Sequence, residues 1–196
     1  MKTRRGRIER KTRETNISVE LAVDGSGSSS VDTGLPFMNH MLELMSKHSL
    51  LDMKVRARGD IQVDYHHTVE DLGLALGSAL DQALGERKQI VRYGWCLLPM
   101  DESLAAAALD LGGRPYLVYE TVIRKRKILD FDVGLIEEFF RAFTVQARMN
   151  LHVAQLYGKD PHHAYEAMFK AVARALGMAC AIDPRVPGVP SSKGRI

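Results

Sequence analysis

Residues 64–70 read Asp-Tyr-His-His-Thr-Val-Glu, and residues 160–166 read Asp-Pro-His-His-Ala-Tyr-Glu. Asp, His, His and Glu therefore recur at a constant offset of 96 residues. A motif of this length repeated at a fixed spacing indicates internal duplication. We expect one domain with two similar halves, about 1–88 and 89–183, followed by an irregular, proline-rich tail over 184–196.

An amphipathic helix is predicted after each motif. The first motif is followed by apolar residues at the three-then-four spacing of a helix: Leu72, Ala75, Leu76, Ala79, Leu80, Ala83 and Leu84. The second is followed in the same phase by Met168, Ala171, Val172, Ala175 and Leu176. Gly85 and Gly177 come next, where glycine commonly ends a helix. Asp64 and Asp160 are predicted N-caps, so each His-His-x-x-Glu is expected to open a helix.

The remaining pattern predicts an α+β fold. Apolar spacing indicates two further helices, over 37–48 and from Leu135 to Phe143. Strand-like runs cover Ile17–Val23, Met53–Arg58, Ile61–Val63, Leu104–Leu109, Tyr116–Val122 and Met149–Leu156. Each half is therefore predicted to contain strands, a helix, strands and a second helix, which is a β-sheet packed against α-helices.

Composition limits the classes of protein that remain. The 196 residues contain no apolar run long enough for a membrane span and no signal peptide, so we expect a soluble, cytoplasmic protein. Cys96 and Cys180 show no metal-binding spacing and are expected to be buried thiols. Basic clusters at Lys2–Arg13 and Arg124–Lys127 are interpreted as a solvated arm and a solvated hairpin edge, because neither contains base-stacking aromatics. We expect no nucleic-acid or membrane partner.

The repeated motif has the composition of a catalytic metal site. On a helix, Glu70 shares a face with His66 or His67, whereas adjacent histidines diverge by about 100° and suit two different ions. Imidazole and carboxylate donors without cysteine suit Mn, Fe, Co or Zn. If the motif served only to cap the helices, Asp64 and Asp160 would be sufficient and the histidines would not be needed. The sequence therefore predicts a two-metal site.

Each half also offers one further donor upstream of its own motif. His40 and Glu138 occupy corresponding predicted helices at an offset of 98 residues. We expect His40 to complete the shell of the first metal and Glu138 that of the second.

Several separate segments resemble imidazoleglycerol-phosphate dehydratases. The resemblance covers nearly the whole chain and rests on residues 37–42 (FMNHML) with His48, 64–71 (DYHHTVED), 99–102 (PMDE), 110–115 (DLGGRP), 151–153 (LHV), 160–166 (DPHHAYE) and 191–194 (SSKG). It implies conversion of imidazole glycerol phosphate to imidazole acetol phosphate in histidine biosynthesis. It also implies two Mn²⁺ ions per active site, which bind the substrate ring as imidazolate. The expected assembly is a homo-oligomer of 24 subunits built from trimers, with active sites where subunits meet.

The resemblance also implies the roles of individual residues. The metal ligands would be His40, His66, His67, Glu70, Glu138, His162, His163 and Glu166. Glu14 would contact substrate and act as the acid/base, supported by His48 and Asp101. The substrate phosphate would be bound by Arg92, Arg114, Ser191, Ser192 and Lys193. Many family members have histidine at the position of Glu138, although Mn²⁺ accepts either donor.

Two other readings of the residues remain. A binuclear hydrolase would use the same ligands to activate water, and substrate assays distinguish it from a dehydratase. A non-enzymatic protein would bind nucleic acid through its basic clusters, with strongly salt-dependent affinity.

Overall fold

The two halves of the chain fold into sheets with the same strand order. The computed structural model describes residues 4–124 and 127–196. The first sheet has the order β1 (Arg5–Lys11), β2 (Thr15–Ala22), β4 (Asp52–Gly59), β3 (Ser29–Asp32). The second has the order β5 (Tyr93–Met100), β6 (Ser103–Asp110), β10 (Asn150–Tyr157), β7 (Tyr116–Glu120). In both, the first three strands are antiparallel and the last pairs in parallel. The predicted duplicated α+β fold is confirmed.

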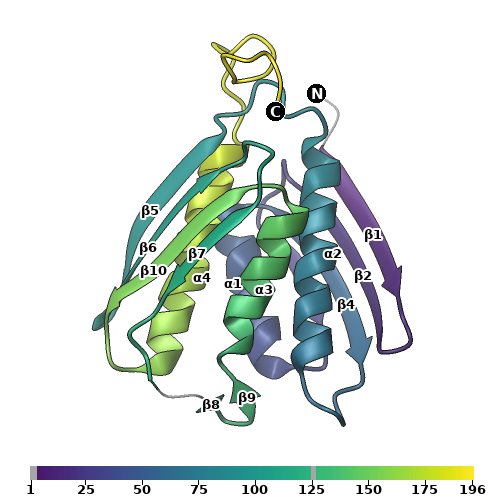
Figure 1. Ribbon diagram of the computed structural model, residues 1–196, viewed down its shortest axis with the longest axis vertical. Helices are drawn as coiled ribbons and strands as arrows, with labels where there is room; N and C mark the ends of the chain where they lie inside the picture. Colours follow the sequence, from purple (N-terminus) through teal and green to yellow (C-terminus); the bar gives the residue numbers. More distant parts are fainter. Residues whose placement is uncertain (1–3, 125–126) are drawn as a thin grey trace.

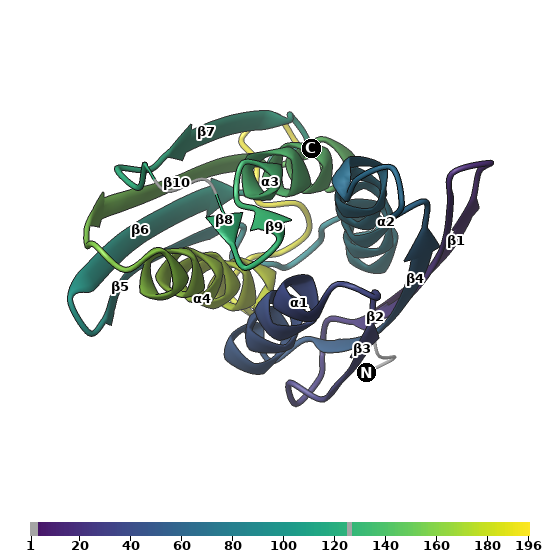
Figure 2. The same ribbon diagram turned by 90° about the horizontal axis from the view of Figure 1, so that it is seen from below.

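Helices fill the space between the two sheets (Figures 1 and 2). They are α1 (Pro36–Ser49), α2 (His66–Leu84), α3 (Leu135–Gln146) and α4 (Pro161–Cys180). Helix α2 covers the first sheet and α4 the second, while α1 packs on α4 and α3 packs on α2. The helix pairs therefore join the two halves. Helix α1 of the first half lies against α4, the helix that begins with the second His-His-x-x-Glu motif.

Alternating burial explains the orientation of the sheets. In β2, Ile17, Val19 and Leu21 are buried and their neighbours are not, which turns one face of the strand to the helices. Two glycines of α2 allow the backbones of α2 and α3 to approach each other closely. A Cβ at Gly73 would lie 2.5 Å from the carbonyl oxygen of Phe139, and one at Gly77 would lie 2.6 Å from that of Phe143.

The structure corrects several predicted boundaries. Tyr65, not Asp64, is the N-cap of α2, although Asp64 still accepts a hydrogen bond from the His66 amide. Helix α4 continues through Gly177 to Cys180. A Cβ at Gly177 would lie 2.6 Å from the carbonyl oxygen of Ser49, so this glycine permits helix contact and does not end the helix. Residues 61–63 form a turn and no strand.

Some strands were missed or misread in the sequence. Most of the basic N-terminal cluster is the edge strand β1, paired with β2 along its length, and not a solvated arm. Strands β3 and β5 were also not predicted. The second basic cluster lies partly outside the described residues, and its last member, Lys127, begins a short hairpin of β8 (Lys127–Ile128) and β9 (Phe131–Asp132). Cys180 is buried as expected, whereas Cys96 is only partly buried.

The outer faces of the two sheets differ in character. Arg7, Glu20 and Lys54 lie side by side across the first sheet, all exposed. On the second sheet, Trp95 and Leu97 are 67% and 58% exposed and pair with alanines of β6. Within the described part of the chain, no helix is long and apolar enough to cross a membrane.

Candidate functional site

The two motifs lie at one end of the molecule. Helices α2 and α4 both begin at the lower end in Figure 1, and Figure 2 is seen from that end. Asp160 caps α4 by accepting hydrogen bonds from the amides of His162 and His163. Asp64 accepts from the His66 amide at 2.7 Å. Both histidine pairs are thus held in the first turn of a helix, as predicted.

Three of the predicted ligands converge into one metal-sized cluster. Donor atoms of His40, His162 and Glu166 all lie within 4.8 Å of one another. Oε2 of Glu166 is 3.4 Å from Nε2 of His40 and 3.3 Å from Nε2 of His162. Two imidazoles and one carboxylate are a donor set that suits a divalent transition metal. The residues present therefore fit such an ion.

The cluster joins the two halves of the chain, which the sequence did not predict. His40 was expected to complete the motif of its own half, yet it lies beside the motif of the other, because α1 packs on α4. Burial would raise the pKa of Glu166, but hydrogen bonds from Lys170 and His40 outweigh it and lower that pKa. The carboxylate is therefore kept charged, as a metal ligand must be.

The two histidines of each pair contact different carboxylates. The ring planes of His66 and His67 make an angle of 88°, and those of His162 and His163 an angle of 81°. Nδ1 of His67 lies 3.0 Å from Asp60, and Nδ1 of His163 lies 2.8 Å from Glu102. These hydrogen bonds raise the pKa of both histidines. In both motifs the first histidine lies beside the glutamate one turn along its helix, and the second lies beside a carboxylate from another segment.

The remaining predicted ligands form a looser group. Nε2 of His66 lies 3.7 Å from Oε2 of Glu70, one turn along α2. Glu138 is in the first turn of α3, which packs on α2, and its carboxylate lies 3.5 Å from Nε of Arg141. Glu138 is not part of the cluster around His40. Its place on the partner helix of α2 nevertheless corresponds to that of His40 on the partner helix of α4.

The predicted acid/base residues lie on hairpins beside the second histidines. Glu14, in the turn between β1 and β2, is 4.0 Å from Nδ1 of His67. Asp101, in the turn between β5 and β6, is 3.7 Å from Nε2 of His163. Their side chains are 56% and 73% exposed. Each half thus presents an exposed carboxylate in the turn of its first hairpin.

The predicted phosphate-binding residues lie at the opposite end. The segment 184–196 lies at the top of Figure 1 with the C-terminus. Arg92 contacts it by donating a hydrogen bond to the carbonyl of Pro190 at 2.7 Å, and its guanidinium also pairs with Asp110 at 2.6 Å. The backbone before Arg114 approaches the same segment, because a Cβ at Gly113 would lie 2.9 Å from Ile196. Ser192 and Lys193 are exposed there, and Ser191 is half-buried.

Helix α4 gives the distance between the two ends. The amide of Arg92 donates to the carbonyl of Ala179, near the end of α4, whereas His162 lies at its start. Seventeen residues at 1.5 Å per residue give about 26 Å. His48, in the last turn of α1, lies about 12 Å along that helix from His40. One chain therefore does not bring the predicted phosphate-binding residues or His48 to its own cluster of His40, His162 and Glu166.

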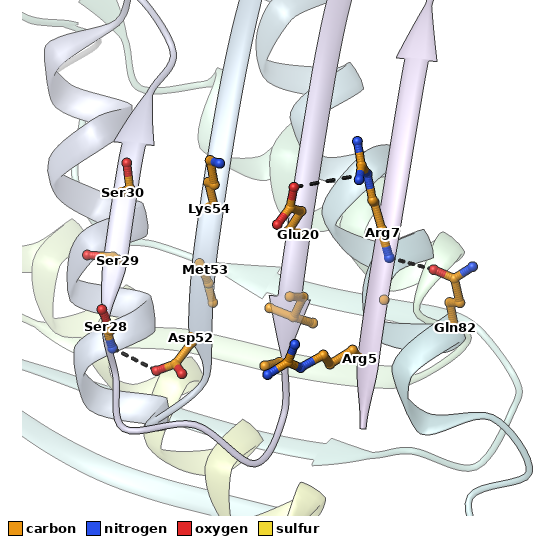
Figure 3. A pocket seen from close by; sticks show the side chains of 13 residues that line it. Arg5, Arg7, Glu20, Ser28, Ser29, Ser30, Asp52, Met53, Lys54 and Gln82 are labelled. Carbon is orange, nitrogen blue, oxygen red and sulfur yellow. Dashed lines mark hydrogen bonds and ion pairs between the residues drawn. The ribbon is translucent and has the colours of Figure 1, made fainter. Parts of the chain in front are cut away.

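A groove elsewhere is not lined by any predicted site residue. It has a volume of about 700 Å³ and crosses the outer face of the first sheet (Figure 3). Arg5, Arg7 and Lys54 line it together with Glu20 and Ser28–Ser30. Arg7 is already paired with Glu9 at 2.7 Å. The groove is separate from the histidine motifs.

Three residues that contact the predicted ligands were not predicted from the sequence. Lys170 pairs with Glu166 one turn further along α4, a spacing that could have indicated the pair. Glu102 directly follows Asp101 in the quoted segment 99–102. Asp60 has no comparable signal, because its contact with His67 depends on how the chain turns after β4.

Comparison with known proteins identifies the family. The family model described as imidazoleglycerol-phosphate dehydratase matches residues 33–176. The chain is 53% identical to the imidazoleglycerol-phosphate dehydratase of Symbiobacterium thermophilum, covering 97% of this chain and 92% of that protein. It is 50% identical to that of Geobacter metallireducens, covering 99% and 100%.

Two solved structures agree with this assignment. The fold matches the crystal structure of the dehydratase from Staphylococcus aureus with a TM-score of 0.83 at 38% identity, covering 91% of this chain and 99% of that one. It matches that from Pyrococcus furiosus with a TM-score of 0.82 at 33% identity, covering 96% and 100%. This chain therefore belongs to the imidazoleglycerol-phosphate dehydratase family.

Proposed function

We propose that this protein removes water from imidazole glycerol phosphate to give imidazole acetol phosphate, with two Mn²⁺ ions per active site. Membership of the family makes it a hydro-lyase of histidine biosynthesis. The observation that carries the metal-dependent part is the cluster of His40, His162 and Glu166, whose donor atoms lie within 4.8 Å of one another.

The chain offers donors for two kinds of metal position. His40, His162 and Glu166 would hold one ion, and His66 with Glu70 would hold another, with Glu138 as a further ligand from α3. When bound, such ions supply Lewis acidity that favours the deprotonated, imidazolate form of the substrate ring. His67 and His163 pair with Asp60 and Glu102 and would bind ions shared with neighbouring copies of the chain.

Proton transfer is assigned to the carboxylates on the hairpins. The carbon next to the ring loses its hydroxyl, and the hydrogen to be removed sits on the following carbon, which becomes the ketone carbon, so a general base must reach that hydrogen. Glu14 is exposed beside His67 and would take this proton, while Asp101 occupies the corresponding place beside His163 and would assist at the leaving hydroxyl. His48 is a supporting residue whose pKa is lowered by burial and by Lys170 and Arg174.

The active site is proposed to form between copies of the chain. A three-carbon side chain connects ring and phosphate in the substrate, far less than the roughly 26 Å between the two ends of α4. The ring at the histidines of one copy and the phosphate at Arg92, Arg114 and Ser191–Lys193 of another satisfy both contacts. Arginine and lysine suit this task because they donate charge-assisted hydrogen bonds to phosphate.

The outer face of the second sheet supports assembly. Exposed Trp95, Leu97 and Tyr93 on β5 form an apolar strip that the charged first sheet lacks. Apolar faces of this kind commonly mark interfaces between proteins. We propose a homo-oligomer of 24 subunits built from trimers, consistent with sites that need more than one copy.

One experiment tests reaction and metal together. Purified protein is stripped of metal, supplied with Mn²⁺ and imidazole glycerol phosphate, and assayed for the enolisable ketone product. We expect product only with the metal, and a fall in particle mass by light scattering after exhaustive chelation. A fully active protein of unchanged mass after chelation would contradict the metal-dependent proposal.

A further inference from the structure

We propose that Asp60 and Glu102 are positioning residues that orient His67 and His163 for metal binding. Each carboxylate holds Nδ1 of its histidine, so that Nε2 remains the free donor atom. The inference rests on the metal-dependent part of the proposed function and adds two residues to it.

In the first half, Asp60 is held by backbone contacts beside the histidine. Its Oδ2 and Oδ1 atoms lie 3.0 and 3.3 Å from Nδ1 of His67. The Asp60 amide donates to the carbonyl of Glu14, and the Asp60 carbonyl accepts from the Val63 amide. The Asp60 side chain is only 18% exposed. This carboxylate is therefore placed before any ion binds.

In the second half, Glu102 is fixed by donors from two segments. Its Oε2 atom lies 2.8 Å from Nδ1 of His163. Its Oε1 atom accepts from the amides of Asp160 and Lys159 at 2.8 and 3.2 Å, and from the Ser103 hydroxyl at 3.1 Å. One oxygen thus anchors the carboxylate to the start of α4, and the other holds the imidazole.

The two contacts did not arise as copies of each other. Asp60 follows β4, whereas Glu102 lies in the hairpin between β5 and β6, so the offset of 96 residues does not relate them. The first histidines differ: across residues 4–124 and 127–196, Nδ1 of His66 and of His162 makes no hydrogen bond to a carboxylate. In both halves a carboxylate pairs with Nδ1 of the second histidine only, and the two carboxylates come from different places in the fold. This recurrence indicates that the contact has a role for that imidazole.

The chemistry explains the role. A carboxylate only accepts, so the proton of the neutral ring lies on Nδ1 and the lone pair on Nε2. The contact also restricts rotation of the ring and increases the basicity of Nε2. Removing such a partner commonly weakens metal binding by about 10- to 100-fold. This is the effect expected for each of the two carboxylates.

The test measures metal affinity in the assembled protein. Asp60→Asn and Glu102→Gln preserve an oxygen that accepts a hydrogen bond, whereas Asp60→Ala removes it. The matched control is Asp32→Asn, which removes an exposed carboxylate of the first half that pairs with Arg58. Metal-stripped proteins are titrated with Mn²⁺ against a competing chelator, and their melting temperatures are measured without metal.

We expect Asp60→Asn and Glu102→Gln to bind Mn²⁺ about 10-fold more weakly, and Asp60→Ala up to about 100-fold more weakly. Asp32→Asn should bind like the unaltered protein, and melting temperatures without metal should change little in the conservative variants. Control-like affinity in both conservative variants would overturn the inference. So would a crystal structure of the Mn²⁺-loaded protein with an Asp60 or Glu102 oxygen bound to the ion. If the unaltered protein bound no Mn²⁺, the proposed function itself would fail instead.

Discussion

Mixing two impaired variants tests whether one active site takes residues from two copies of the chain. His162→Ala removes a proposed metal ligand at the start of α4, and Lys193→Ala removes a cation near the C-terminus. His162 lies at the start of α4, whereas Arg92, which contacts the C-terminal segment, bonds to Ala179 near the other end, about 26 Å further along the helix axis. A chain carrying either substitution keeps the other end intact. Only a site built from two different chains can combine two intact ends.

The expected recovery follows from random assembly. With equal amounts of the two variants, a site has an intact metal end with probability one half and an intact phosphate end with probability one half. About a quarter of the sites in a symmetric oligomer are then complete. If one chain supplied both ends, no mixed oligomer would contain a complete site. The two arrangements therefore predict clearly different activities.

The assay compares mixed oligomers with each variant alone. Both chains are unfolded, mixed and refolded together, and mixing is checked by mass spectrometry of the intact particle. Rates are measured well below saturating substrate, where losing one charged hydrogen bond of about 1.5–3 kcal/mol slows Lys193→Ala roughly 10- to 100-fold. The residual activity of Lys193→Ala alone is then well below the quarter of full activity expected from the mixture. A mixture of His162→Ala with Glu166→Ala, both at the metal end, serves as the control without recovery. Verified mixed particles that gain no activity would refute the reasoning.

Four further predictions concern single residues. Glu14→Gln should retain Mn²⁺ and substrate binding but lose about 10²- to 10⁴-fold in kcat, because it removes a proton acceptor; unaltered turnover in an intact oligomer would remove Glu14 from the mechanism. Glu138→Ala should lower metal content by elemental analysis, whereas Glu138→His should retain much of it; normal metal content and turnover in the alanine variant would make Glu138 an ordinary surface residue. Gly77→Ala should destabilise the protein by about 1–3 kcal/mol in denaturant titrations, since its Cβ would lie 2.6 Å from a carbonyl oxygen of α3; an unchanged midpoint would show that the helices adjust. Burial raises the pKa of Cys180 to about 12, so this thiol should stay unmodified by alkylating reagents at about pH 8 until the protein unfolds, as mass spectrometry can show; modification in the native state would contradict its burial.

Features that depend on neighbouring residues could be predicted from the sequence. The helices α2 and α4 follow from apolar spacing, and the place of Asp160 before Pro161 predicts the start of α4 correctly. The 100° step of a helix also predicts that His66 and His67 contact different groups, which are Glu70 and Asp60. The duplication was visible because both motifs kept their spacing.

Edge strands were harder to predict. Strand β1 contains Arg5, Arg7 and Lys11, whose charges suggested a solvated arm. It is a strand because its amides and carbonyls pair with β2, while its outward side chains stay in water. Half-buried edge strands have a weak apolar signal, so pairing with a neighbour decides their structure.

By itself, the sequence determined the duplicated α+β architecture, the helix starts and the residue types available to bind metal. Only the tertiary structure decided which of these residues meet. His40 lies beside Glu166, 126 residues away, because α1 packs on the motif helix of the other half. The physical reason is that hydrophobic periodicity depends on residues close together in the sequence and shows only which face of a helix or strand is buried. Which other element packs on that face depends on contacts between residues far apart in the sequence, across the whole core. The same packing places Asp60 against His67 and separates the predicted phosphate-binding residues from the histidines by the length of α4.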